Sequence, residues 1–192
     1  MKVFILFIIY FIFHIYMSNN LENIASQYYD TRKKNNKTTS KVYDIAHKFL
    51  PEMNKYDTIH NIITFIFILP IFLDFNILQE FLGYWIVIFI LRTITTMVTI
   101  LPKYKECKYN GETLFHSVFG GCYDKIFSGH FASVFLATLL YLKYGWIKIP
   151  MLILINLINS ISILLVRGHY TIDLIVAFFV TLFVYQNDLR IK

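Results

Sequence analysis

The fold is decided by residues 120–174, a stretch that opens with GGCYDKIFSGHF and closes with RGHYTIDL. Two apolar runs, 131–142 and 149–166, lie between its histidines His130 and His169 and are separated by a short turn. As helices that rise about 1.5 Å per residue, each run with its flanks roughly crosses a hydrocarbon core of ~30 Å. Two crossings return the chain to the side it left, so we expect both histidines at the same membrane face.

Asp173 follows His169 by one helical turn, so both side chains project from one stripe of the helix predicted there. A carboxylate in this position accepts the proton of one ring nitrogen, orients the ring and stabilises the imidazolium that forms during catalysis. The other nitrogen is then a nucleophile, and His130 can serve as general acid and general base. The three residues therefore indicate a catalytic site at the membrane–water boundary.

Two other interpretations of these residues stay open. A histidine and an aspartate at this spacing also occur together by chance. Two histidines and one carboxylate are also a plausible ligand set for a metal ion. Because the sequence has no HExxH-type pair or Cys/His cluster to support a metal, we predict no metal ion and no other cofactor.

The composition is typical of an integral membrane protein. Of 192 residues, 57% are hydrophobic and 18% aromatic, and the mean hydropathy is +0.55. Soluble domains are about 45–50% apolar and do not hold several near-continuous apolar runs. A membrane β-barrel would alternate apolar and polar residues, whereas these runs are apolar on every side. The sequence therefore predicts an all-α, polytopic membrane helical bundle with about six transmembrane helices.

We expect the membrane-crossing helices at residues 1–17, 58–79, 81–101, 131–142, 149–166 and 170–185. The predicted organisation is an N-terminal transmembrane span (1–17), a polar loop (18–57), a membrane core (58–187) and a C-terminal tail (188–192). No small-residue cleavage pattern follows the first run, so we expect it to be retained. Pro70 should kink the second helix, and a break at Gln79-Glu80 should end it.

The net charge of +6 and the pI of about 9.2 raise the question of an anionic partner. The Lys and Arg residues mostly flank the apolar runs and do not alternate with exposed aromatic residues. This favours anionic lipid head groups as partners and argues against nucleic acid. The sequence does not indicate an oligomeric state.

Three cations are candidates for binding a substrate phosphate, namely Arg92, Lys125 and Arg167, because cations suit the spread negative charge of a transferring phosphoryl group. Arg92 lies about ten residues from the end of its predicted helix, roughly 15 Å deep. An arginine at that depth normally turns into the bundle or toward a wet cavity. It either pairs with Asp74 or a carbonyl, or it meets an anionic ligand.

Two features depend on the side of the membrane that the loops face. Cys107 and Cys122 can form a disulfide if their loop is lumenal and are free thiols if it is cytosolic. Asn36 begins an Asn-Lys-Thr glycosylation acceptor and would report topology. Most Lys and Arg residues fall on the side that holds the motifs, so the positive-inside rule places that side in the cytosol.

The motifs SGH (128–130) and HYTID (169–173), each at the start of a predicted span, resemble the type 2 phosphatidic acid phosphatase superfamily. More narrowly, the chain resembles the sphingomyelin synthase branch. RTITTMVTILP (92–102) is similar to the arginine-led run of that branch, and the Cys-x-Asp before SGH and the Leu-Pro-acid step at 50–52 also fit. The resemblance covers roughly residues 50–187 and includes the six-span layout.

This resemblance implies a two-step transfer of a lipid head group. His169, helped by Asp173, would attack the phosphorus of a choline phospholipid and form a phosphohistidine. His130 would protonate the departing diacylglycerol oxygen and then accept the proton of the acceptor hydroxyl, and Arg92 would contact the phosphate. The acceptor would be ceramide, or diacylglycerol as in the phosphatidylcholine:diacylglycerol cholinephosphotransferases that RGHYTIDL also resembles.

The family resemblance also implies a lumenal or exoplasmic site in an endomembrane or the plasma membrane, which we prefer over the positive-inside assignment. The chain departs from the branch at Glu52, where the branch has aspartate, at Tyr123, where it has glycine, and at residues 103–105, which replace a proline and glycine. Two rival functions remain. One is a lipid phosphate phosphatase with water as acceptor, and the other is a catalytically silent membrane protein that binds lipid.

Overall fold

The computed structural model describes residues 2–34, 42–53, 57–102, 122–123 and 125–191. In chain order its helices are α1 (Lys2–Lys34), α2 (Ile45–Phe49), α3 (Asp57–Ile68), the 3-10 helix η2 (Leu69–Leu73), α4 (Phe75–Val98), α6 (Gly129–Lys143), α7 (Ile149–Leu165) and α8 (Thr171–Gln186). All regular secondary structure within these ranges is helical, which confirms the predicted all-α class.

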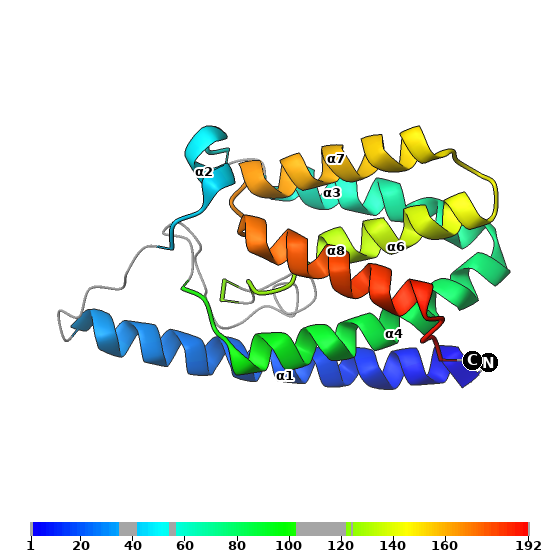
Figure 1. Cartoon of the computed structure of the whole chain (residues 1–192). Helices are drawn as coiled ribbons and strands as arrows, with labels where there is room; N and C mark the ends of the chain where they lie inside the picture. Colours follow the sequence, from blue (N-terminus) through cyan, green and yellow to red (C-terminus); the bar gives the residue numbers. More distant parts are fainter. Residues whose placement is uncertain (1, 35–41, 54–56, 103–121, 124, 192) are drawn as a thin grey trace.

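Helix α6 is the centre of the bundle. It packs against α3, α4, α7 and α8, while α1 lies alongside α4 (Figure 1). Leu136 and Leu140 of α6 are fully buried. Because α6 carries apolar or small side chains on nearly all sides, it needs neighbours all round, and this fixes its central place. The two chain termini lie together at one end of the bundle (Figure 1).

Two helices are long and apolar enough to cross a membrane, α1 through its segment Lys2–Tyr29 and α4. Four shorter apolar helical segments accompany them, Thr58–Leu73, Gly129–Lys143, Ile149–Leu165 and Thr171–Gln186. The prediction of about six transmembrane helices is therefore not confirmed: of the apolar helical segments in the described residues, two are long enough to cross a membrane.

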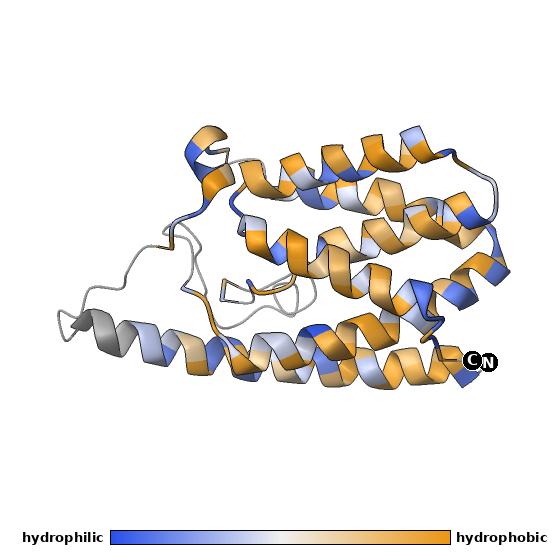
Figure 2. Ribbon diagram, viewed as in Figure 1, coloured by the Kyte–Doolittle hydropathy of each residue, from blue (hydrophilic) through white to orange (hydrophobic). Residues whose placement is uncertain are grey.

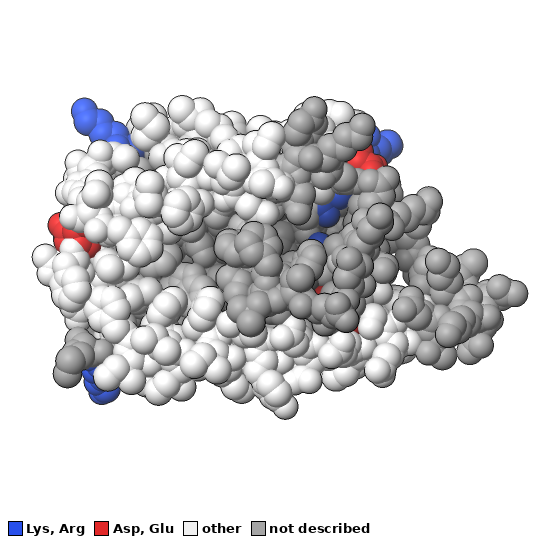
Figure 3. Space-filling view, turned by 180° about the vertical axis from the view of Figure 1, so that it is seen from behind, with Lys and Arg blue, Asp and Glu red and all other residues white. Residues whose placement is uncertain are grey.

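The outer surface of the bundle is apolar. Figure 2 shows hydrophobic residues along the lengths of the helices and hydrophilic ones concentrated toward their ends and turns. On the face seen in Figure 3, a broad uncharged surface separates charged side chains at one end from a hollow nearer the other end, in which further charged side chains are visible. Large side chains such as Ile153, Leu157 and Phe179 are exposed. Exposed apolar surface on this scale indicates contact with something other than water.

The predicted boundaries of the last three spans agree with α6, α7 and α8 to within two residues. Ser128 caps α6 by accepting a hydrogen bond from the Phe131 N–H at 3.3 Å. Pro150 occupies the first turn of α7, where the absence of an N–H costs nothing. Ser128 thus places the SGH motif at the start of α6, and the HYTID motif lies at the start of α8, whose N-cap is Tyr170.

The predicted polar loop at 18–57 is wrong for residues 18–34, because α1 continues to Lys34. Polar residues here still form a helix because one stripe of it is buried. Ser18, Leu21, Glu22 and Ala25 are all buried at helical spacing, and the Glu22 carboxylate accepts a hydrogen bond from the Tyr123 N–H at 2.7 Å. Tertiary contacts thus extend the helix beyond its apolar half.

The predicted break at Gln79-Glu80 is also wrong, since the chain turns at Asp74. Pro70 lies in the first turn of the 3-10 helix η2. The Asp74 side chain caps α4 by accepting hydrogen bonds from the N–H groups of Asn76 (2.8 Å) and Ile77 (3.3 Å). A capping aspartate decides a helix start more strongly than the polar pair does, because α4 buries Glu80 on its inner face and leaves Gln79 exposed.

Glu80 instead organises the end of the bundle opposite the motifs. It is buried and accepts hydrogen bonds from Lys143, Arg190 and the Tyr144 hydroxyl, the last at 3.0 Å. These contacts join α4, the end of α6 and the C-terminal tail. We call Glu80, Lys143, Tyr144 and Arg190 the far-end cluster.

Candidate active site

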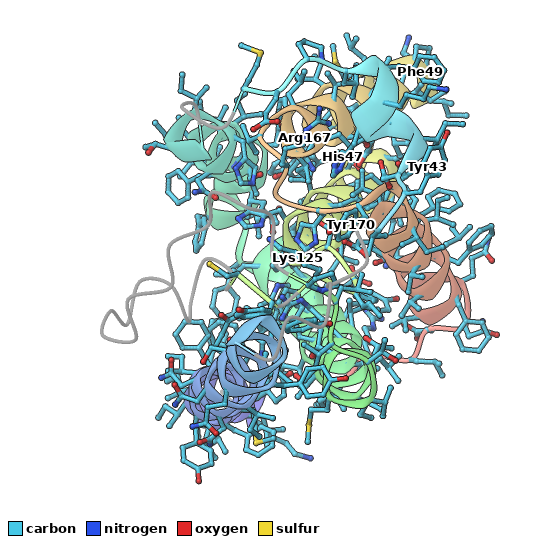
Figure 4. The ribbon with its side chains drawn as sticks, turned by 90° about the vertical axis from the view of Figure 1, so that its left-hand side faces the viewer. Tyr43, His47, Phe49, Lys125, Arg167 and Tyr170 are labelled. Atoms are coloured by element: carbon cyan, nitrogen blue, oxygen red, sulfur yellow. The ribbon has the colours of Figure 1, made fainter. Side chains whose placement is uncertain are left out.

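The two motifs predicted to be catalytic meet at one end of the bundle, where α6 and α8 begin and α7 ends (Figure 1). The Ser128 N–H donates a hydrogen bond to the Asp173 carbonyl at 3.2 Å and joins the two turns directly. Figure 4 looks onto this end, with Lys125 and Tyr170 near its middle and α2 at its edge. The hairpin of α6 and α7 therefore brings His130 and His169 to the same end, as predicted.

The turn before α6 is shaped around Arg92. Phe127 is fully buried and has a positive φ of 80°, which is rare for a residue with a side chain. Its carbonyl accepts a hydrogen bond from Arg92 Nε at 3.3 Å. A Cβ on Gly129 would lie 3.2 Å from the same nitrogen, tighter than ordinary packing. The glycine of SGH thus allows Arg92 to approach the start of the helix.

The turn between α7 and α8 is a Schellman motif. The Gly168 N–H donates to the Ile163 carbonyl at 3.1 Å, and the Arg167 N–H donates to Leu164 at 3.3 Å. Arg167 takes the left-handed position (φ 57°) that glycine usually fills. This motif reverses the chain within a few residues and fixes where His169 emerges.

The hydrogen bonds of His169 decide which ring nitrogen carries the proton. Nδ1 lies 2.8 Å from the Lys125 carbonyl and 3.2 Å from Asp173 Oδ2. Both partners are acceptors, so Nδ1 carries the proton and Nε2 keeps its lone pair. Asp173 is fully buried, and its Oδ2 also accepts the Tyr170 N–H at 2.8 Å, which locks the carboxylate into the first turn of α8.

His130 faces a third histidine that the sequence analysis did not single out. Its ring and that of His60, on α3, have centroids 4.7 Å apart at an angle of 58°. His60 is buried. His169, Arg92 and Lys125 also lie within electrostatic reach of His130. The end of the bundle therefore gathers three imidazoles and two cations around one point.

Arg92 is buried and is held in place by several groups. Besides Phe127, it contacts His14 of α1, where Nη1 donates to Nε2 at 3.4 Å. Of the alternatives considered for Arg92, the structure thus includes a carbonyl partner, while Asp74 lies at the start of α4 and caps it. His14 had no predicted role, and its contact with Arg92 shows that α1 helps to position this cation.

Lys125 and Arg167 both donate to backbone carbonyls at the site. Lys125 Nζ lies 2.7 Å from the Gly168 carbonyl. Arg167 Nη2 lies 3.0 Å from the His47 carbonyl and 2.8 Å from that of Leu50. Arg167 therefore clamps the loop around α2 to the end of α7, and its role in binding phosphate, like those of Arg92 and Lys125, stays a prediction.

The segment around α2, from Asp44 to Leu50, lies over the start of α8, and we call it the strap. Asp44 accepts hydrogen bonds from the Thr171 N–H (2.6 Å) and Thr171 hydroxyl (2.9 Å), and His47 Nε2 donates to the His169 carbonyl at 3.0 Å. Burial lowers the pKa of His47 below its usual 6.5; Asp44 opposes this shift and Arg167 adds to it. Burial raises the pKa of Asp44, but hydrogen bonds from His47 and Thr171 outweigh it and bring the pKa below its usual value.

Sequence reasoning missed Asp44, His47 and His60 because each meets the site through a contact between distant parts of the chain. The one available signal was a polar, titratable residue beside or within an apolar run, as at His60. Cys122 is disulfide-bonded, while Cys107 and the glycosylation acceptor at Asn36 lie outside the described residues. In the ranges that the structure describes, no group of three or more His, Cys, Asp or Glu side chains is placed to hold a metal ion.

Residues 121–188 match the family model described as "PAP2 superfamily C-terminal". The match supports the PAP2 superfamily. It contains both motifs, and hence His130, His169 and Asp173. A stretch of 64 residues, 31% of this chain, is 39% identical to a phosphatidylinositol:ceramide inositolphosphotransferase of Trypanosoma cruzi (strain CL Brener). The aligned stretch covers 19% of that relative's length. Neither similarity points to the sphingomyelin synthase branch in particular.

Proposed function

We propose that this protein is a multi-pass membrane enzyme that transfers the phospho-head group of a glycerophospholipid to ceramide or diacylglycerol through a phosphohistidine. The observation that carries this proposal is the hydrogen bonding of His169. With Nδ1 donating to the Lys125 carbonyl and to Asp173, Nε2 is the nucleophilic nitrogen. Asp173 also stabilises the positive charge that the ring acquires on attack.

In the first step, His169 Nε2 attacks the phosphorus and the bond from phosphorus to the diacylglycerol oxygen breaks. His130, as the imidazolium, gives its proton to that oxygen, so diacylglycerol leaves as a neutral alcohol. The anionic phosphate favours the imidazolium when the substrate binds. The head group and its phosphate are then held on His169.

In the second step, the acceptor hydroxyl gives its proton to His130 and its oxygen attacks the phosphorus. The bond between phosphorus and Nε2 breaks, and His169 returns to its starting form. Arg92 and Lys125, within electrostatic reach of His130, suit the negative charge on the phosphoryl oxygens in both steps. His60, packed on the His130 ring, would hold that ring in position between the steps.

The substrate class is supported by two different similarities. The motifs SGH and HYTID resemble enzymes that move phosphocholine, and the trypanosome relative carries a name that specifies phosphatidylinositol and ceramide. Both reactions share a phosphodiester donor and a lipid alcohol as acceptor. The superfamily match equally supports a lipid phosphate phosphatase, in which water replaces the lipid alcohol.

Vesicles that contain the purified protein separate these functions. Each preparation receives phosphorus-labelled phosphatidylcholine, phosphatidylinositol or phosphatidic acid, together with ceramide, diacylglycerol or neither. Label in a new lipid only when an alcohol acceptor is present supports the transferase. Soluble label from phosphatidic acid without an acceptor would support the phosphatase, and label that never leaves the donor would support a silent lipid-binding protein.

The phosphohistidine is tested with donor alone. We expect acid-labile label on the unchanged protein, and none on a His169→Ala variant whose transfer rate falls by about a thousandfold or more. Asp74→Asn is the matched control, because asparagine also caps helices and Asp74 lies at the opposite end of the bundle. Label that remains on His169→Ala would place the nucleophile elsewhere.

A further inference from the structure

Helix α2 has an inverted distribution of side chains. The polar residues Asp44, which caps α2, and His47 face the protein and make the hydrogen bonds of the strap. The large apolar residues face outward, with Ile45 of α2 56% exposed and Phe49 of α2 and Tyr43, just before the cap, each 75% exposed. A helix on a protein surrounded by water shows the opposite arrangement. Figure 4 shows Tyr43 and Phe49 on the outer edge of α2, with His47 and Arg167 on its inner side.

The apolar face of α2 continues an apolar surface that begins on the bundle. Helix α2 packs against α7 near the end where α7 stops, and the Met53 N–H donates to the Leu165 carbonyl at 2.8 Å. The outer face of α7 exposes Leu157 and Ile161. Under the proposed function this face lies in the acyl chains, so α2 sits at its edge, at the level of the head groups.

The remaining side chain on the outside of α2 is a cation. Lys48 is exposed, and its Nζ lies 5.6 Å from the centre of the Phe49 ring. A lysine beside aromatic and aliphatic side chains suits the head-group boundary, where the ring meets the acyl chains and the ammonium meets lipid phosphate. Aromatic residues are enriched at this boundary for the same reason.

We propose that α2 is an interfacial helix whose Tyr43, Ile45 and Phe49 side chains insert into the phospholipid leaflet at the end of the bundle that holds His169. The strap makes this contact relevant to the site. Asp44 binds Thr171, His47 binds the His169 carbonyl, and Arg167 binds the carbonyls of His47 and Leu50. Insertion of α2 therefore fixes the turn between α7 and α8, which carries His169, at the depth of the lipid phosphates. The inference deepens the proposed function and rests on it for the substrate.

Fluorescence quenching by brominated lipids tests the insertion without any catalytic readout. A Phe49→Trp variant and a Leu157→Trp variant are placed in phosphatidylcholine vesicles whose acyl chains are brominated either near the head group or near the chain end. The signal of the unchanged protein, from Trp85 and Trp146, is subtracted. We expect Phe49→Trp to be quenched most by the shallow bromines and Leu157→Trp by the deep ones.

The two variants separate failure of this inference from failure of the proposed function. If Leu157→Trp is quenched and Phe49→Trp is reached only by iodide from the water, the insertion of α2 is wrong and the membrane-spanning bundle stands. If neither is quenched by lipid, both are wrong. Quenching of Phe49→Trp alone would support α2 as an interfacial helix and overturn the placement of α7.

A kinetic comparison tests whether insertion serves the reaction. Phe49→Ser is expected to raise the apparent KM for long-chain lipids in vesicles on the order of tenfold, with kcat retained. Phe49→Leu, which keeps the apolar contact, should restore the KM, and a water-soluble short-chain donor should be used equally well by all three proteins. A fall in kcat for the short-chain donor would contradict the interfacial role, since it would place Phe49 in the folding of the site.

Discussion

The two ends of the bundle both bury charged residues, but they hold them differently. In the far-end cluster, Glu80 is surrounded by Lys143, Arg190 and the Tyr144 hydroxyl, so opposite charges meet. At the end with the motifs, Lys125 and Arg167 donate to the carbonyls of neighbouring turns. Opposite charges hold helices together with little regard to direction, whereas bonds to carbonyls fix the path of the backbone.

This difference indicates that the two ends of the bundle have different roles. The far-end cluster ties α4 and α6 to the C-terminal tail, and it can tolerate small shifts because ion pairs keep most of their attraction as they lengthen. The site end holds two turns in place by directional bonds, and these turns present His130 and His169. We therefore expect changes at the far end to alter stability, and changes at the site end to alter catalysis.

The strongest test of this difference removes one carboxylate charge from each end. Asp173→Asn should lower the transfer rate by about 10³–10⁴-fold, because an amide cannot stabilise the imidazolium and can disturb the tautomer of His169. Glu80→Gln should leave the rate per folded molecule unchanged and lower the free energy of unfolding by about 1–3 kcal/mol, since Lys143 and Arg190 are partly exposed. Thermal unfolding in micelles and lipid transfer are measured on both variants.

The reverse pattern would contradict this division. If Glu80→Gln were inactive while fully folded, the far end would take part in the reaction. If Asp173→Asn lost only stability, the buried carboxylate would serve to cap α8 through its bond to Tyr170, and His169 would not need it.

His60 gives a second test of how the end with the motifs positions its side chains. If this ring positions His130 through hydrogen bonding as well as packing, His60→Phe should lower kcat by roughly 10–100-fold with little change in KM, because phenylalanine keeps the ring and loses both nitrogens. His60→Gln, which keeps a polar donor and acceptor, should restore part of the rate. Full activity of His60→Phe would show that His60 serves only in packing.

The sequence predicts the helices and motifs that local chemistry decides. The starts of α6 and α7 follow from the cap at Ser128 and from Pro150, and the placement of His130 and His169 at one end follows from counting crossings. Where tertiary contacts decide, prediction from the sequence failed. Helix α1 runs on past its apolar half because Leu21 and Ala25 are buried against the rest of the bundle.

The same reasoning explains which site residues were missed. Asp173 is found from its spacing to His169, but the prediction that both lie on one helix is wrong. His169 lies in the turn before α8, which begins at Thr171, and the two side chains meet because Asp173 is in the first turn of that helix. Asp44 and His60 cannot be found in this way, since their partners Thr171 and His130 lie on other helices far along the chain. The local signals were also misleading, because Asp44 lies in the predicted polar loop and a single histidine near the end of an apolar run, such as His60, usually serves only as an interfacial residue.

The smallest effect that we expect is a loss of folding stability at low pH, caused by His47 in the strap. The folded protein binds a proton at His47 less readily than the unfolded chain does, because burial lowers its pKa below 6.5 and Arg167 adds to the shift. Between 6.5 and the lowered value the unfolded state holds more protons, so the free energy of unfolding should fall as the pH falls through this window. Asp44 stays ionised there, since its pKa is also lowered, and Asp173 is the other carboxylate that acts on His47.

His47→Gln isolates this contribution, because the glutamine amide can still donate to the His169 carbonyl but does not titrate. Thermal unfolding of the two proteins, followed from pH 8 to about pH 5, should show a smaller loss of stability in His47→Gln, while the other histidines contribute equally to both. The measurement avoids activity, which would also respond to the catalytic side chains proposed here. If both proteins lost stability in parallel, the strap would not sense acid. The loss of stability in acid would then come from residues other than His47. The end with the motifs would then differ from the far-end cluster only in its effect on catalysis.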